Sequence, residues 1–225
     1  MSEAHAGTGS RTPETESWGE TTFATEPPDL AEARALAKER GIPPISLAAS
    51  EGQLMQVLLR MHGARKVVEV GTLFGYSGVW IARALPDDGH LWTLEMDPLH
   101  ADTAEEVFAM TGVTDQVTLV RGPGAEGLRS IESEGPFDAI FMDADKAGYP
   151  GYLDWAESHL RSGGLVIGDN TYAFGNIHRN PESLEPQQRP GTAGLQAFNR
   201  RLADPERYVG TLLPTGQGMT VALKK

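Results

Sequence analysis

The feature that most constrains the fold is a regular alternation of short apolar runs with helical patterns from residue 67 onward. The apolar runs have the length of strands, and each is followed by a segment with helical periodicity. Strands that alternate with helices of this length build parallel βαβ units. The sequence therefore predicts an α/β fold with a doubly wound sheet and helices on both faces. The predicted strands are Val67–Val70, His90–Leu94, Val117–Val120, Phe137–Met142 and Leu165–Gly168.

The predicted helices begin and end at residues with known capping preferences. The tetrapeptide that starts at Asp29 has the pattern of a capping box, and its helix is expected to stop at Gly41. A second helix is expected to start after Ser50 and to end at Gly63. The remaining helices are predicted over Ser77–Leu85, Pro98–Met110, Ala125–Glu132, Tyr149–Leu160 and Ala193–Ala203.

The segments before residue 28 and after residue 171 depart from the alternation. The polar segment 172–192 is expected to be a loop, and Tyr208–Leu213 and Met219–Lys224 flank a glycine-containing turn, as in a hairpin. Residues 1–27 are rich in Ser, Thr, Glu and Gly, which predicts a flexible arm that could also act as a lid or a dimer contact. Because 225 residues suit one sizeable α/β domain, residues 28–225 are predicted to form it.

Composition excludes several classes of protein. The apolar runs are far shorter than the roughly 20 residues that span a bilayer, and no basic segment precedes an apolar leader. A membrane partner is therefore not expected, and a cytoplasmic location is. The chain has no cysteine, which rules out disulfides, thiolate metal sites and a Cys nucleophile. A net charge of −12 disfavours a nucleic-acid partner.

The first predicted strand ends at a glycine-rich turn that suits a nucleotide-like cofactor. Gly71, Gly75 and Gly78 follow Glu69, and ligands of doubly wound sheets approach the backbone at this turn. The spacing differs from the dinucleotide pattern, and Glu69 would repel a pyrophosphate. S-adenosylmethionine carries a sulfonium and an amino group and no phosphate, so this acid favours it. Glu95, which ends the second strand, can accept both ribose hydroxyls of an adenosine.

Oxygen-bearing side chains follow the fourth and fifth predicted strands. Asp143 follows one strand, and Asp169 and Asn170 follow the next, so all three are expected at one edge of the sheet. Oxygen ligands without His or Cys indicate a hard cation, Mg²⁺ by default, with Mn²⁺ or Ca²⁺ as substitutes. Lys146 could accept the proton of a metal-activated hydroxyl if the nearby cation favours its neutral form.

Each of these features also has a purely structural interpretation. Glycines serve turns, acids cap strand ends, and Asp-Asn is ordinary loop chemistry. The functional interpretation is favoured because Glu69 and Glu95 end consecutive strands, and because Asp143 and Lys146 lie one strand away from Asp169.

Five segments, in order between Ser50 and Lys224, carry a family resemblance. They are SEGQLMQVLL, VVEVGTLFGYSGVWIARAL, HLWTLEMD, FDAIFMDADKAGYPGYLDWAESHLRSGGLVIGDN and GMTVALK. They resemble the cation-dependent O-methyltransferases of the caffeoyl-CoA and catechol O-methyltransferase group. The DADK element and the properly spaced Asp-Asn pair make the resemblance specific.

The resemblance implies a Rossmann-like sheet of seven strands, mostly parallel with an antiparallel final strand, and a homodimer. It assigns Asp143, Asp169 and Asn170 to the metal and Lys146 to proton abstraction, with Asp143 also in the catalytic set. It places Tyr76 beside the methionine portion of the cofactor. The residues expected to contact the cofactor are Glu69, Gly71, Tyr76, Ser77, Glu95, Ala125 and Asp143.

The acceptor is defined only as a class. A metal-chelated vicinal diol can be aligned for methyl transfer, so catechol-like phenols or natural-product hydroxyls of small molecules are expected. Tyr172 and Phe174 follow the metal pair and are candidates to stack on an aromatic ring, with core packing as a comparable alternative. Arg179 and Arg189 could meet an acidic substrate, although a solvated loop face is favoured.

Two other functions use the same residues. A tRNA methyltransferase acting on a hydroxylated base could share the fold and the metal site, but the acidic charge and the absence of a Lys/Arg cluster in the sequence disfavour it. A non-catalytic cofactor-binding module is disfavoured by the presence of both Asp143 and Lys146.

Overall fold

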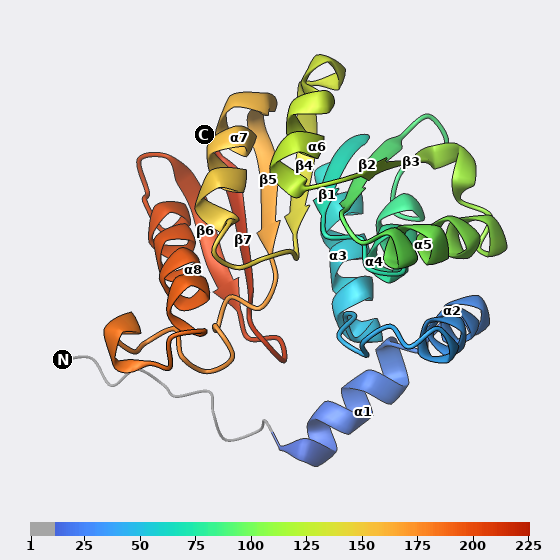
Figure 1. Ribbon diagram of the computed structural model, residues 1–225, viewed down its shortest axis with the longest axis horizontal. Helices are drawn as coiled ribbons and strands as arrows, with labels where there is room; N and C mark the ends of the chain where they lie inside the picture. The colour runs from blue at the N-terminus through green and yellow to red at the C-terminus, as the bar shows by residue number, and fades with distance from the viewer. Residues whose placement is uncertain (1–11) are drawn as a thin grey trace.

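The computed structural model describes residues 12–225, and the beginning of the predicted arm, residues 1–11, lies outside the described residues. One sheet contains seven strands in the order β3-β2-β1-β4-β5-β7-β6 (Figure 1). The strands are β1 (Lys66–Val70), β2 (His90–Glu95), β3 (Val117–Arg121), β4 (Phe137–Met142), β5 (Leu160–Gly168), β6 (Tyr208–Leu213) and β7 (Met219–Lys224). Strands β1 to β5 pair in parallel, whereas β7 runs antiparallel to both β5 and β6. The predicted sheet, including the C-terminal hairpin and the antiparallel final strand, is confirmed.

Helices cover both faces of this sheet, as predicted. The helices are α1 (Pro13–Phe23), α2 (Pro28–Glu39), α3 (Ala49–His62), α4 (Tyr76–Ala82), α5 (Pro98–Met110), α6 (Gly124–Ser130), α7 (Tyr149–His159) and α8 (Arg189–Leu202). In one buried cluster, the helices α2, α3, α4 and α5 pack on one face of the sheet through residues such as Met55 and Val107. In a second buried cluster, the helices α6, α7 and α8 pack on the other face through residues such as Leu153 and Phe198. No helix of the described residues combines the length and the apolarity needed to cross a bilayer.

The strand order reverses at the centre of the sheet. Strand β1 lies between β2 and β4, and Val70 is in register with Leu94 on one side and with Met142 on the other. Met142 is in turn in register with Gly168 of β5. The residues that follow these positions therefore meet at one edge, and such a reversal opens a crevice outside the carboxyl ends of the strands.

Five predicted helix starts are too late, by one residue at α2, α4 and α6, by two at α3 and by four at α8. Helix α2 begins at Pro28 instead of being capped by Asp29, because a proline at the first helical position is already fixed in a helical φ. Asp29 lies in the first turn and pairs with Arg83. Helix α3 begins at Ala49, where the Glu51 carboxylate accepts the Ala48 N–H at 3.0 Å.

The predicted arm contains a helix that the composition of residues 1–27 does not suggest. Thr12 caps α1, and Thr15 completes a reciprocal capping box. None of the residues of α1 is buried, as expected for a segment so poor in apolar periodicity. The loop predicted over residues 172–192 is also shorter at its end, since α8 already begins at Arg189.

Candidate active site

A cavity of about 630 Å³ opens at the carboxyl ends of β1, β2 and β4. This volume lies within the usual range for small-molecule sites. The cavity brings together most of the residues singled out in the sequence, although these come from separate segments. Those that line it are Gly71, Tyr76, Ser77, Glu95, Asp143, Lys146, Asn170 and Phe174.

The turn after β1 lies directly against the end of β4. Gly71 has φ +99°, and a Cβ atom there would lie 2.3 Å from the carbonyl oxygen of Asp143. Only glycine allows both this conformation and this approach. The Asp143 N–H donates to the Val70 carbonyl at 2.9 Å, which fixes the two segments together. The cofactor turn and the first residue of the predicted metal set are thus positioned by the same contact.

Glu69 is buried beneath this turn and does not line the cavity. Its Oε2 accepts the Thr93 hydroxyl at 2.6 Å. Its Oε1 is buried with no hydrogen bond among the described residues. Burial raises the pKa of Glu69 to about 8, with smaller contributions from the charges of Asp143 and Glu95. A carboxyl with such a pKa is mostly protonated at neutral pH.

Glu95 lines the cavity with both carboxylate oxygens already oriented. Oε2 accepts the Leu73 N–H, and Oε1 accepts the Asp97 N–H, each at 2.8 Å. Each oxygen retains a lone pair, so the carboxylate can still accept the two hydroxyls of a ribose. The predicted role of Glu95 is compatible with this geometry.

Tyr76 connects the cavity to the N-terminal segment. Its hydroxyl donates to Glu26 Oε1 at 2.6 Å, and the Arg34 guanidinium lies 3.8 Å above its ring centre. Arg34 also binds Ser46 Oγ at 2.5 Å and the Leu47 carbonyl at 2.6 Å. Ser46 and Leu47 line the cavity. The sequence reasoning missed this contribution, because the signal is a contact between residues distant in the chain.

Ser77 and Ala125 differ in their relation to the cavity. Ser77 is buried and lines it, as predicted for a cofactor contact. Ala125 is exposed near the start of α6 and does not line it, although its neighbour Gly124 does. Gly122 and Gly124 form this part of the wall, so the approach here is to backbone.

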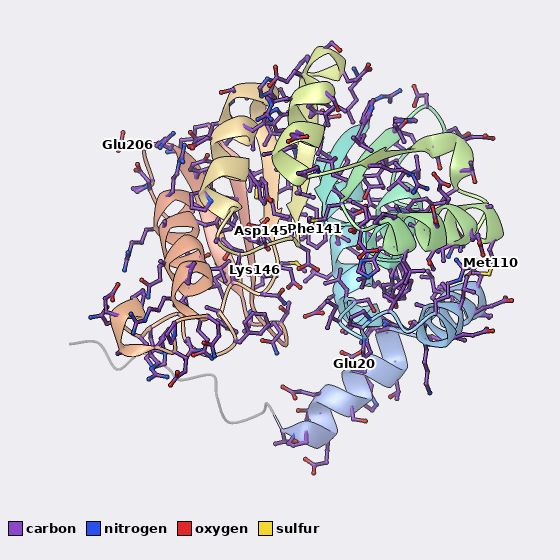
Figure 2. All side chains as sticks on the ribbon, viewed as in Figure 1. Glu20, Met110, Phe141, Asp145, Lys146 and Glu206 are labelled. Carbon is purple, nitrogen blue, oxygen red and sulfur yellow. The ribbon has the colours of Figure 1, made fainter. Side chains whose placement is uncertain are left out.

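Lys146 and Asp143 form an ion pair on the cavity wall. Lys146 Nζ lies 2.7 Å from Asp143 Oδ1 and 3.2 Å from the Tyr149 hydroxyl oxygen. The buried Tyr149 hydroxyl also lies 2.6 Å from the Met142 carbonyl oxygen and 3.0 Å from that of Asp169. Tyr149 thus joins the ends of β4 and β5 beneath Lys146. Figure 2 shows Lys146 and Asp145 in the loop after β4, near the middle of the molecule.

Helix α8 packs directly on the backbone of Lys146. A Cβ atom at Gly194 would lie 2.2 Å from the Lys146 carbonyl oxygen, and one at Gly191 would lie 3.3 Å from Lys146 Cβ. The first turns of α8 therefore determine where the lysine can lie. Neither glycine was identified in the sequence, since the glycines of a helix interior have no distinctive local pattern.

Asp169 and Asn170 follow β5 beside this pair. Asp169 is 4% exposed, and its Oδ1 has no hydrogen bond among the described residues. Asn170 has φ +56° and donates through Nδ2 to Asp169 Oδ2 at 3.1 Å. Burial raises the pKa of Asp169 to about 7, and the nearby charge of Asp143 adds to this. An acid with an unsatisfied buried oxygen beside a second acid fits a hard cation.

The kinds of side chain present also matter for whether these residues could hold a metal ion. Within residues 12–225, no group of three or more His, Cys, Asp or Glu residues is arranged to hold a metal ion. The predicted ligands are two carboxylates and one amide, so the third donor belongs to Asn170.

The two aromatic candidates for the acceptor have different surroundings. Phe174 lines the cavity at its rim, is 65% exposed and has φ +52°. Tyr172 does not line this cavity and instead packs on the C-terminal hairpin, where a Cβ atom at Gly218 would lie 2.7 Å from its ring. The structure therefore brings Phe174, and not Tyr172, to the site.

The sheet order and the antiparallel last strand define a Rossmann-like methyltransferase fold. The pattern of the O-methyltransferase family matches residues 20–225. The catechol O-methyltransferase of Niastella koreensis is 38% identical over 186 residues, which cover 82% of this chain and 81% of that protein. The chain therefore belongs to the O-methyltransferase family and is an S-adenosylmethionine-dependent O-methyltransferase.

Solved structures agree with this assignment. The O-methyltransferase of Bacillus cereus in complex with SAH (S-adenosylhomocysteine) is 30% identical, with a TM-score of 0.86 over 94% of this chain and 97% of that chain. TomG of Streptomyces achromogenes, which is involved in tomaymycin synthesis and was solved with SAM, is also 30% identical. Its TM-score is 0.85 over 94% of this chain and 96% of that chain.

Proposed function

We propose that this enzyme methylates a hydroxyl oxygen of a small catechol-like phenol or natural-product hydroxyl, with a divalent cation held by Asp143, Asp169 and Asn170. The observation that carries the proposal is the buried, unsatisfied Oδ1 of Asp169 beside the Asp143–Lys146 pair. A buried carboxylate oxygen without a partner is costly, and a cation would satisfy it. The name of the Niastella koreensis relative supports a catechol as the acceptor class.

The proposed ligands suit Mg²⁺, and Mn²⁺ or Ca²⁺ could substitute, because all three donors are oxygens. When bound, such a cation would act as a Lewis acid that makes a phenolic hydroxyl more acidic. Asp143 and Asp169 supply the negative charge at the ends of β4 and β5, and the Asn170 amide supplies a neutral oxygen.

Lys146 is the proposed general base. Its Nζ is on the cavity wall, where it would accept the proton of the acceptor hydroxyl. Lys146 Nζ lies 2.7 Å from Asp143 Oδ1, so the role requires Asp143 to be engaged elsewhere, as it would be as a ligand. The hydroxyl oxygen then forms a bond to the methyl carbon, the carbon–sulfur bond breaks, and S-adenosylhomocysteine leaves.

The cofactor is proposed to lie along the turn after β1. Glu95 would hold the ribose through its two oriented oxygens, and Tyr76 and Ser77 would line the methionine end. Gly71 and the glycine at the start of α6 have no side chain, so the cofactor would lie close to the backbone there. The net charge of −12 favours this sulfonium cofactor and a small acceptor over a polyanion such as tRNA.

The test is release of S-adenosylhomocysteine from a panel of catechols, phenols and aliphatic alcohols, run with EDTA and again after excess Mg²⁺ is restored. We expect catechol turnover that vanishes with EDTA and returns with Mg²⁺. Turnover that is indifferent to EDTA would contradict the cation site. Turnover of tRNA together with silence across the panel would replace the acceptor class. The homodimer and the cytoplasmic location stay predictions.

A further inference from the structure

A second cavity of about 420 Å³ adjoins the first, between the loop after β5 and the start of α8. The two cavities share three lining residues, Asp145, Lys146 and Phe174. An acceptor whose hydroxyl lies beside Lys146 therefore has a second space within reach of its far end. A volume of this size accommodates a substituent of several heavy atoms in addition to the reacting ring.

The wall of this second cavity is amphipathic. Leu195 and Ala173 are buried and give it an apolar base. Thr192 is 4% exposed and places a hydroxyl-bearing side chain on the same wall. The side chains of Asn176 and Gln187 add amide groups to the same wall. Thr192 lines the cavity, so its hydroxyl can donate or accept one hydrogen bond with a ligand there.

The charged groups around this cavity do not favour an anionic ligand. Lys146 and Asp145 are the only ionisable residues among its lining residues, all of which are described. Lys146 pairs with Asp143, and Asp145 accepts the Tyr152 hydroxyl. In the proposed function Lys146 is committed to the reacting hydroxyl, and the Asp145 carboxylate has no ion pair among the described residues, so it would repel an anionic substituent.

The loop arginines do not change this charge balance. Arg189 donates to the Leu184 carbonyl at 2.9 Å and pairs with Glu182 at 3.3 Å. Arg179 donates to Asn176 Oδ1 at 3.1 Å. Neither arginine lines the cavity, so neither would receive an anionic substituent there.

We propose that this second cavity is an acceptor subsite for an uncharged substituent that carries a hydrogen-bonding group, such as a carboxamide or a hydroxyl, on an apolar stem. The inference rests on the proposed function, because it places the reacting hydroxyl beside Lys146. Thr192 and the amides of Asn176 and Gln187 bind the polar end, and Leu195 contacts the stem. Phe174 lies between the two cavities and contacts both parts of the acceptor.

The test compares three catechols that differ only at the end of one chain: 3-(3,4-dihydroxyphenyl)propionamide, the corresponding propionic acid and 4-propylcatechol. All are assayed as S-adenosylhomocysteine release with Mg²⁺ at neutral pH, where the acid is ionised. We expect kcat/KM for the amide to exceed that for propylcatechol by about 3–10-fold, the value of one or two neutral hydrogen bonds. The acid should be at least about 10-fold below the amide.

Two variants assign the effect to the subsite. Thr192→Val keeps the volume and removes the hydroxyl, and Gln187→Ala removes an exposed side chain that folding does not require. Each should lower the amide-to-propylcatechol ratio of kcat/KM, by about 3-fold or more. Thr211→Val, an exposed threonine on the distant strand β6, is the matched control and should leave the ratio unchanged.

The possible outcomes distinguish failure of the proposed subsite from failure of the proposed function. Turnover of propylcatechol with an acid that is as good as the amide overturns the subsite and leaves the proposed function standing. An amide preference that survives both variants also overturns it. Silence with all three catechols overturns the proposed function and the subsite together.

Discussion

The two halves of the main cavity differ in how far the protein itself satisfies their polar groups. In the half formed by β1 and β2, both Glu95 oxygens accept backbone N–H groups, and the Tyr76 hydroxyl is bound by Glu26. In the half formed by β4 and β5, Asp169 Oδ1 has no hydrogen bond among the described residues. Glu69 also has an unsatisfied oxygen, and neither acid is among the residues that line the cavity. Asp169 adjoins the lining residue Asn170 and accepts a hydrogen bond from its side chain, whereas Glu69 lies beneath the β1 turn.

This difference indicates that the protein preorganises one half and leaves the other to be completed by ligands. Groups held by backbone donors need no reorganisation when the cofactor binds, which favours affinity. In the acidic half, Asp143 is paired with Lys146, while burial and the charge of Asp143 raise the pKa of Asp169 and its Oδ1 stays unsatisfied. The proposed cation would satisfy this oxygen. Substitutions in the two halves should therefore separate cofactor affinity from turnover.

The largest effect is expected at Lys146. Lys146→Met removes the proposed base and should lower kcat by about 10²–10⁴-fold, while the affinity for S-adenosylhomocysteine measured by calorimetry stays near that of the wild type. Lys66→Met is the control, since Lys66 binds the Glu134 carbonyl at the opposite edge of the sheet. A variant at Lys146 that keeps the full rate at every pH would end its role as base.

Asp169→Asn keeps the shape of the side chain and removes its charge. Turnover should fall by more than about 10²-fold, because altering a ligand costs more than altering its supporting residues. Cofactor affinity should change little, because Glu95 and the β1 turn are untouched. Asp154→Asn, an exposed acid paired with Arg201, serves as the control. Equal losses of cofactor affinity and turnover would contradict the proposed difference between the two halves of the cavity.

Glu95→Gln tests the preorganised half. The amide cannot accept both the Leu73 and Asp97 N–H groups, so the affinity for S-adenosylhomocysteine should fall by about 10-fold. The loss should appear in the KM for the cofactor and not in the KM for the acceptor. Glu105→Gln on the exposed face of α5 is the control. Unchanged cofactor affinity would remove Glu95 from the cofactor site.

Tyr149→Phe tests whether a buried hydroxyl positions the base. Loss of its bond to Lys146 Nζ should lower kcat by about 3–10-fold, with the cofactor KM unaffected. Tyr208→Phe removes a comparable hydroxyl that binds Glu157 outside the site. Both variants should lose stability, measured as Tm, but only the first should lose rate. The positioning role fails if the two variants have the same kcat.

The smallest effect concerns the contact between the N-terminal segment and Tyr76. Burial raises the pKa of Glu26, but hydrogen bonds from Arg34 and Tyr76 outweigh it and hold the pKa below its usual range. Such a group stabilises the fold above its unfolded pKa and loses this contribution as the pH falls through its folded pKa. Glu26→Gln should therefore lower Tm by about 2–4 °C at pH 7, and the difference should shrink toward pH 3, below the carboxyl range of about 4. Glu32→Gln on the exposed side of α2 is the control, and a pH-independent difference would contradict the ionic account.

The sheet could be predicted because its signals are local. Apolar runs such as Phe137–Met142 mark β4 to the residue, and Asp143 and Asp169 follow from the rule that parallel strands end at one edge. The helix starts were less accurate because two capping signals competed. At Asp29 the preceding prolines decided the start, and at Thr12 a Thr–Pro–Glu–Thr capping box was present but stood in a segment without apolar periodicity.

The rest of the site depends on contacts between distant residues. Glu26 and Tyr76 are separated by fifty positions, and their bond forms only because α2 packs beside α4. Tyr172 and Phe174 are close in sequence, but only the fold determines that one packs on Gly218 while the other reaches the cavity. Gly194 similarly gains its importance from the Lys146 carbonyl that α8 meets.

The most direct measurement is a Mn²⁺ titration followed by electron paramagnetic resonance, on the wild type and on Asp169→Asn, each saturated with S-adenosylhomocysteine. The account predicts a single tight Mn²⁺ site per chain in the wild type, displaced by Mg²⁺ and lost in the variant. Equal binding in both proteins, or no tight site in the wild type, would contradict the claim that a cation completes the acidic half of the cavity.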